Sequence, residues 1–239
     1  MIRIEHLTKK FGSFIAVDDL NIEVKGGEFY GFLGPNGAGK TTTIKIMTGL
    51  FTPSSGSVVI NGFDIQRSPI EAKMSTGYIP DQPFLYEKLT GREFLHFSAG
   101  LYKMNHRVTT ERIEQFKQDF EIDSWLDRRT EYYSQGMRQR SVIAAALLHD
   151  PKVLIIDEPM IGLDPRSAHI VKERLKQKSK EGVAIFMSTH SLSVVEELCD
   201  RVGIIKNGKL IYEDSITVFQ QLKEKHDGKI ESLFMELTK

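Results

Sequence analysis

The stretch "GPNGAGKTT", residues 34–42, restricts the fold of this chain more than any other. The run before it, "EFYGFL", predicts a buried strand. The run after it, "TTTIKIMTGL", predicts a helix with Ile44 and Met47 on one face and Leu50 as a further candidate. The spacing G-x-x-x-x-G-K-[ST] between a strand and a helix is typical of a phosphate-binding loop. We therefore expect the chain to fold around a phosphate site at the end of this strand.

Each part of the loop has a physical reason. Glycine lets backbone N–H groups turn inward around phosphate oxygens, and the helix that begins near Lys40 points its positive N-terminal end at the anion. We expect the Lys40 ammonium to reach the outer phosphates and the Thr41 hydroxyl to bind Mg²⁺. The expected nucleotide-contacting residues are Gly34, Pro35, Asn36, Gly37, Ala38, Gly39, Lys40, Thr41 and Thr42.

A second apolar strand, "VLIIDEP" at residues 153–159, ends in two adjacent carboxylates. Asp157 is placed to hold Mg²⁺, directly or through water, and Glu158 is placed to polarise an attacking water as a general base. His190 ends another strand, "VAIFMSTH", at the edge where open α/β sheets bind ligands, and is a candidate for contact with a γ-phosphate. The expected catalytic residues are Glu158, His190 and Lys40.

The remaining pattern describes an α/β chain with a helical insertion. Strands alternate with helices after residue 151, which predicts a mostly parallel sheet with crossover helices. Asn61-Gly62 and Asn207-Gly208 lie between apolar runs and predict two β-hairpins. From residue 83 to 150 turn signals become scarce and helical spacing dominates. We expect a core at about 1–82 and 151–239 with a helical subdomain at about 83–150.

Charge and composition narrow the possible partners. Lys plus Arg and Asp plus Glu are equal at 32 each, so the net charge is +0, which does not favour nucleic acid as a partner. The single cysteine, Cys199, excludes an intrachain disulfide and fits a reducing compartment. The charged N-terminus does not fit a secretory signal, and no uncharged apolar run approaches 18 residues. We expect a cytoplasmic location, at a membrane only through a partner.

The motifs, taken in their order, resemble those of the ATP-binding cassette (ABC) ATPases over nearly the full chain. "GPNGAGKTT" resembles the Walker A loop, "VLIIDEP" the Walker B strand, and "YSQGMRQR" the LSGGQ signature. The resemblance implies that Phe11 stacks on adenine, that Asp164 in "GLDP" belongs to the D-loop, and that His190 is the switch histidine. It also implies one ABC ATPase domain over 1–239, with a P-loop NTPase core, a mostly parallel sheet, an antiparallel β N-terminal subdomain and an inserted helical subdomain.

The resemblance explains why a polar, basic stretch leads into the apolar run "SVIAAALLH". In the family, the signature helix caps the γ-phosphate of ATP held by a second subunit. Ser134 and Gly136 are therefore expected to contact ATP across a head-to-tail dimer. Two ATP molecules would lie between two chains, as a homodimer or as a pair with a related cassette. Gln135 and Met137 depart from the LSGGQ pattern.

A second departure concerns the Q-loop. The family has a glutamine after an apolar strand, where it contacts Mg²⁺ and water. In "GYIPDQPFLYEKLTG", Asp81 holds that position when the residues are counted back from "LYEKLTG", and Gln82 follows it. A carboxylate is also able to approach Mg²⁺. Both Asp81 and Gln82 stay candidates for the metal site, together with Thr41 and Asp157.

The resemblance implies the ATP-hydrolysing motor subunit of a transporter, with ATP and Mg²⁺ as cofactors and membrane-spanning subunits as separate partners. The implied docking segment is "PFLYEKLTGREFLHF", whose aromatic residues divide between a partner groove and the helical core: Phe84, Tyr86, Phe94 and Phe97. The variant motifs favour export, from the inner face of the cell membrane. The alternatives are a soluble cassette acting on ribosomes or nucleic acid, and a module that binds nucleotide without turnover.

Overall fold

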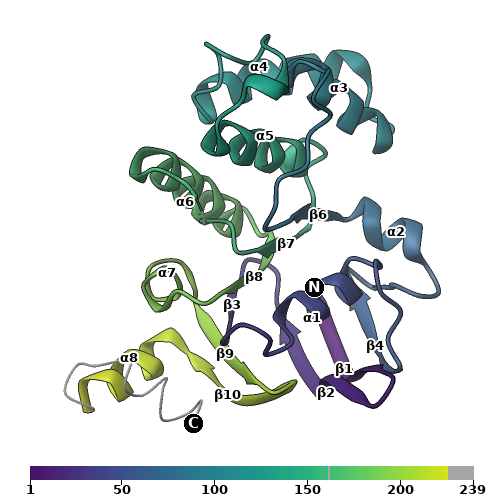
Figure 1. Cartoon of the computed structure of the whole chain (residues 1–239), viewed down its shortest axis with the longest axis vertical. Helices are drawn as coiled ribbons and strands as arrows, with labels where there is room; N and C mark the ends of the chain where they lie inside the picture. The colour runs from purple at the N-terminus through teal and green to yellow at the C-terminus, as the bar shows by residue number, and fades with distance from the viewer. Residues whose placement is uncertain (161, 226–239) are drawn as a thin grey trace.

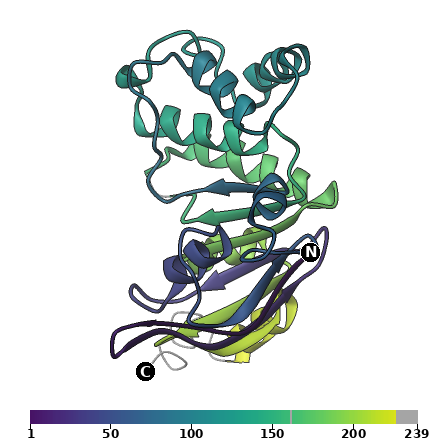
Figure 2. The ribbon, with the colours of Figure 1, turned by 90° about the vertical axis from the view of Figure 1, so that its right-hand side faces the viewer.

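The computed structural model describes residues 1–160 and 162–225. Two β-sheets and several helices make up one end of the molecule, and a group of helices forms the other end (Figure 1). A view turned by 90° shows the helical group at the top and the strands of the N-terminal sheet near the bottom, with strands of the larger sheet between them (Figure 2).

The smaller sheet is antiparallel, with the order β2-β1-β4-β5. Its strands are β1 (Ile2–Phe11), β2 (Phe14–Val24), β4 (Ser55–Ile60) and β5 (Phe63–Asp64). The predicted Asn61-Gly62 hairpin is confirmed, because Ile60 pairs with Phe63 and both turn residues have positive φ, 51° and 88°. Strand β1 passes through an irregularity at His6, where φ is 48°.

The larger sheet has the order β10-β9-β3-β8-β7-β6. Its strands are β3 (Phe29–Leu33), β6 (Thr76–Ile79), β7 (Val153–Asp157), β8 (Ala184–Thr189), β9 (Arg201–Lys206) and β10 (Lys209–Ser215). Neighbouring strands from β9 to β6 run parallel, and β9 and β10 form the antiparallel hairpin predicted at Asn207-Gly208. The expected mostly parallel sheet with an antiparallel β subdomain is confirmed.

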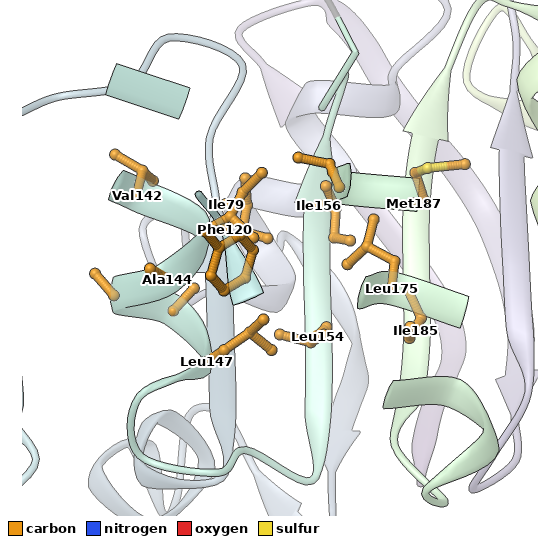
Figure 3. Packing of buried hydrophobic residues seen from close by; sticks show 14 of the residues in the cluster. Ile79, Phe120, Val142, Ala144, Leu147, Leu154, Ile156, Leu175, Ile185 and Met187 are labelled. Carbon is orange, nitrogen blue, oxygen red and sulfur yellow. The ribbon is translucent and has the colours of Figure 1, made fainter. Parts of the chain in front are cut away.

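Strands β7 and β8 of the larger sheet are buried on both faces, which is why they are continuous apolar runs in the sequence. In β7, Ile155 faces the core shared with the antiparallel sheet, whereas Leu154 and Ile156 face the helices. Figure 3 shows this second core, where Leu147 of α5 (Gln135–Leu147) and Leu175 of α6 (Pro165–Lys180) lie close to the sheet.

The other helices are α1 (Lys40–Met47), α2 (Pro69–Met74), α3 (Gly91–Leu101), α4 (His106–Asp119), the 3₁₀ turn η1 (Thr130–Tyr132), α7 (Leu192–Leu198) and α8 (Ile216–Lys225). Ile44 and Met47 of α1 are buried, as predicted. The expectation for Leu50 is wrong: it lies beyond the end of α1 and is 59% exposed. Gly49, with φ 68°, turns the chain away from the helix axis before Leu50 is reached.

Helices α3, α4 and α5 lie between β6 and β7 in the chain, within the predicted helical region. Helix α3 begins with a capping box, in which the Thr90 side chain accepts from the Glu93 amide at 3.2 Å and the Glu93 carboxylate accepts from the Thr90 amide at 2.8 Å. The boundaries at 83 and 150 stay a prediction. Among the described residues, no helix combines the length and apolar character needed to cross a bilayer.

Candidate nucleotide-binding site

A pocket of about 420 Å³ forms where the predicted motifs meet. Its lining residues are Phe14, Ala16, Asn36, Gly37, Gly39, Lys40, Thr41, Thr42, Asp81, Glu158 and His190. Glu158 follows β7 and His190 follows β8, and these strands are parallel neighbours with Asp157 paired to Ser188. Because the carboxyl ends of parallel strands share one edge of a sheet, three distant segments of the chain meet here.

The phosphate loop joins β3 to α1 and lies tightly against the rest of the core. A Cβ atom on Gly39 would lie 2.5 Å from the Ala16 carbonyl oxygen, and one on Gly34 would lie 2.5 Å from the Ile205 carbonyl oxygen. Gly39 also has φ 112°, which a side chain would strain. Helix α1 begins at the next residue, so its first N–H groups lie beside the pocket.

Lys40 is buried in this loop, with 6% of its surface exposed. Its ammonium donates to the carbonyl oxygens of Gly34 at 2.7 Å and Pro35 at 3.2 Å, and lies 3.8 Å from Glu158 Oε1. Burial lowers the pKa of Lys40, and the carboxylates of Glu158 and Asp157 oppose that effect. Gly34 and Pro35 therefore act here as acceptors for Lys40, and neither they nor Ala38 line the pocket.

Asp157 ends β7 and is 1% exposed. The Ser188 hydroxyl donates to its carboxylate, and Thr41 is a second hydrogen-bond partner. Burial raises the pKa of Asp157, and these hydrogen bonds act in the opposite direction. Thr41 and Asp157 thus supply a hydroxyl and a carboxylate side by side, which is the oxygen chemistry that Mg²⁺ prefers.

The two candidates for the Q-loop position are placed differently. Asp81 lines the pocket and is close enough to Asp157 to raise the pKa of that carboxyl through its charge. Gln82 is exposed and does not line the pocket. Of the two candidates, Asp81 is therefore the one that lines the pocket, and its role as a metal ligand stays a prediction.

Glu158 lies at the turn after β7 with a left-handed backbone, φ 49°. Its amide donates to the Ser188 carbonyl oxygen at 3.2 Å, which fixes the turn. The Oε1 atom lies 2.9 Å from His190 Nδ1, and the Glu158 side chain is only 13% exposed. A non-glycine residue in this region costs about 1–2 kcal/mol. The strained turn aims the carboxylate into the pocket between Lys40 and His190.

The aromatic residue expected to stack on adenine is not among those that line the pocket. Phe11 is 46% exposed and its ring meets Phe51 edge-on at 5.7 Å. Phe14, which pairs with Phe11 across the β1–β2 turn, lines the pocket together with Ala16 and is 63% exposed. The sequence analysis missed Phe14 and Ala16, and the role of Phe11 stays a prediction. The proximity of Phe14 to Phe11 in the sequence was the available signal.

The signature residues lie elsewhere, at the N-terminus of α5. Ser134 caps the helix by accepting from the Met137 amide at 3.3 Å, and is exposed. Asp164 caps α6 beside it and accepts from the Ser167 amide at 3.0 Å and hydroxyl at 2.6 Å. A Cβ on Gly136 would lie 3.3 Å from Asp164 Oδ2. Ser134, Gly136 and Asp164 are therefore grouped together, but outside the pocket of their own chain.

Comparisons with known proteins identify the family of the chain. The family model described as ABC transporter matches residues 17–161. The probable multidrug ABC transporter ATP-binding protein YbhF of Escherichia coli (strain K12) is 36% identical, covering 99% of this chain but 41% of that protein. The bacitracin transport ATP-binding protein BcrA of Bacillus licheniformis is 40% identical, covering 95% of this chain and 72% of that protein.

Among solved structures, one described as an ATP binding subunit of an ABC transporter superposes with a TM-score of 0.92 at 32% identity, covering 100% of both chains. The motif order, the pocket that joins the phosphate loop to the ends of β7 and β8, and these matches lead to the same result. The chain belongs to the ABC transporter family, as an ATP-binding cassette.

Proposed function

We propose that this chain hydrolyses ATP as the motor subunit of an ABC transporter. One observation carries the proposal: Lys40 and Thr41 of the phosphate loop line the same pocket as Glu158, whose carboxylate is hydrogen-bonded to His190. A loop that holds phosphates beside a positioned carboxylate is suited to hydrolysis of the terminal phosphate.

Each of the residues in the pocket that carry charge then has a definite role. The Lys40 ammonium has three donors, so it can exchange the carbonyl oxygens of Gly34 and Pro35 for outer phosphate oxygens. Glu158 accepts a proton from water as the water oxygen attacks the γ-phosphorus, which gives ADP and phosphate. In the imidazolium form both ring nitrogens of His190 donate, so Nδ1 can hold the Glu158 carboxylate while Nε2 donates to the γ-phosphate.

The donor set also fits Mg²⁺. Thr41, Asp157 and Asp81 offer one hydroxyl and two carboxylates, which are hard oxygen ligands. These residues would hold the ion, which when bound neutralises charge on the outer phosphate oxygens. The Ser188 hydroxyl keeps one oxygen of Asp157 oriented in the meantime.

We further propose that two chains enclose ATP between them. Ser134 and Gly136 start a helix whose N-terminus is exposed and lies outside the pocket of its own chain. Such an N-terminus favours an anion, so the bound nucleotide of a second cassette is a suitable ligand. A two-fold pairing would bring each signature to the partner's phosphate loop and use both sites equally.

Transport is supported by an exposed aromatic cluster after Asp81. Phe84, Tyr86 and Phe97 are 70%, 47% and 43% exposed, and their rings contact in series at 5.4 and 5.1 Å. Phe94 falls on the other side of the expected division, because it is 7% exposed and packs in the helical core. The cluster suits the docking of a membrane-spanning subunit. The printed names of the relatives, multidrug and bacitracin transport, support export.

Two experiments test the proposal. The purified chain should release phosphate from ATP when Mg²⁺ is present and should stop when the ion is chelated. Isolation of the tagged chain from its own cells in mild detergent should bring with it a membrane-spanning protein, at the cytoplasmic face of the membrane. Ribosomal proteins or nucleic acid in its place would overturn the transport proposal and leave the ATPase proposal standing.

A further inference from the structure

The N-terminus of α5 rests on the segment that follows Glu158, through contacts at successive turns of the helix. Gln139 is 1% exposed, and its side-chain amide donates to the Pro159 carbonyl oxygen at 3.4 Å. One turn earlier, Gln135 lies against Gly162: a Cβ on that glycine would be 2.7 Å from Gln135 Nε2 and 2.9 Å from its Cδ. The helix start and the segment therefore have closely matched surfaces.

Gln135 is also a position where the chain departs from the LSGGQ pattern, which has glycine there. The long side chain at 135 is accommodated because residue 162 has none. Gly162 has φ 74°, so its backbone conformation also favours glycine. Both residues are exposed, so the contact lies at the surface, and a Cβ at residue 162 would force the flexible Gln135 side chain to move away.

This contact joins parts of two different nucleotide sites. Pro159 follows Glu158, the proposed base of the chain's own site, and Gly162 lies a few residues further along the chain. Gln135 lies between Ser134 and Gly136, the proposed ligands of the γ-phosphate held by the partner chain. The Asp164 cap of α6 makes the far end of the segment rigid, through its 2.6 Å hydrogen bond from the Ser167 hydroxyl.

We infer that Gln135 is a positioning residue. By contacting Gly162, it keeps the N-terminus of α5 in a fixed position relative to the residues that follow Glu158 in the chain. The inference rests on the proposed ATP-enclosing dimer. It predicts that the contact affects closure of the dimer and leaves nucleotide affinity of the single chain unchanged, because Gln135 and Gly162 are not among the residues that line the pocket.

The test uses the full chain with Glu158→Gln, which should bind ATP without turnover. Nucleotide affinity is measured at low protein concentration, and the ATP-dependent dimer is measured by sedimentation. Adding Gly162→Ala drives a Cβ into Gln135, and we expect the dimer dissociation constant to rise about 10-fold with unchanged monomer affinity. In the same chain, Gln135→Ala removes the side chain that the new Cβ meets, and it should restore part of the lost dimer affinity.

Matched variants separate the contact from backbone strain. Gly182 has φ 95° but open space around its missing Cβ, so Gly182→Ala imposes strain without a contact and should leave the dimer unchanged. Gln135→Met keeps the side-chain length and should keep the dimer, whereas Gln135→Ala alone should weaken it. Thermal unfolding confirms that each variant is folded.

The outcomes distinguish the two proposals. If the Gly162→Ala variant dimerises as well as its parent, or if Gln135→Ala gives no recovery, the positioning role is overturned and the ATP-enclosing dimer stands. If the Glu158→Gln chain binds ATP but forms no dimer, both fail. Equal losses from Gly162→Ala and Gly182→Ala would also overturn the inference, because the effect would then come from backbone strain alone.

Discussion

The phosphate loop and the signature both present the N-terminus of a helix, yet the chain builds them in opposite ways. At the phosphate loop the charged side chains are buried: Lys40, which begins α1, is 6% exposed, and Asp157, which ends β7, is 1% exposed. At α5 the cap residue Ser134 is exposed, and its side chain accepts one hydrogen bond from the Met137 amide. The comparison shows that the charged side chains of one site are enclosed by their own chain, whereas the cap of the other is open at the surface.

The largest expected effect comes from removing the proposed base. Glu158→Gln keeps the hydrogen-bonding shape toward His190 but cannot take a proton, so hydrolysis should fall by about 10²–10⁴-fold while ATP still binds. Phosphate release and nucleotide binding are measured separately. Glu181→Gln, which removes a charge paired with Lys178 away from the pocket, is the matched control. Undiminished turnover in the Glu158→Gln chain would exclude the base role.

Lys40→Ala tests the enclosed site itself. The loss of a charged donor to the outer phosphates should weaken ATP binding by roughly 10- to 100-fold, as expected for hydrogen bonds to charged groups worth about 1.5–3 kcal/mol. Titration calorimetry provides the affinity. Lys45→Ala lies on the same helix outside the pocket and should bind ATP normally. Equal affinity in the two variants would contradict the assignment of the phosphate loop.

Ser134→Ala tests the open site. Because Ser134 does not line the pocket of its own chain, monomer affinity for ATP should stay unchanged while hydrolysis at saturating ATP falls about 10-fold. Asn105→Ala removes the equivalent cap of α4 and is the matched control. It should lower the stability of its helix by a similar amount, about 1 kcal/mol, and leave hydrolysis unchanged. A weakened monomer affinity in Ser134→Ala would show that the two sites are not separate in the way proposed.

The remaining expected effect is on stability rather than hydrolysis, and it concerns the other end of the signature helix. His149 follows α5, and its ring stacks on Tyr102 with centroids 3.5 Å apart. Burial lowers the pKa of His149 to about 4, and a contact with the Thr76 backbone acts in the opposite direction. The folded pKa lies below the unfolded value near 6.5, so the unfolded chain takes up the proton first as the pH falls.

The free energy of unfolding should therefore decline as the pH falls from about 6.5 to about 4. His149 should account for roughly 1–3 kcal/mol of that decline, and it should have no effect on stability above this window. His149→Phe keeps the ring against Tyr102 and should make the decline shallower. The free energy of unfolding in urea, measured at pH 7 and pH 5 for both chains, provides the comparison. Equal pH dependence in the two chains would show that His149 is not buried in the neutral form.

Most of the residues that meet in the pocket could be predicted because their signals are local. Lys40 and Thr41 belong to one motif, and Glu158 and His190 each end an apolar run, so strand polarity alone brings them to one edge. Side chains whose surroundings depend on other elements could not be placed in this way. Leu50 continues a helical spacing beyond the real end of α1, and the local pattern left open which of Phe84, Tyr86, Phe94 and Phe97 would be buried.

The sequence by itself determined the elements, their order and the chemistry at the strand ends, since hydrophobic period, turn residues and short motifs act over a few residues. Which segments are in contact could be seen from the tertiary structure alone. Phe14 and Ala16 line the pocket, Asp81 lines it whereas Gln82 does not, and Gln135 lies against Gly162. Such contacts join residues far apart in the chain, so they follow from how the sheets and helices pack against one another.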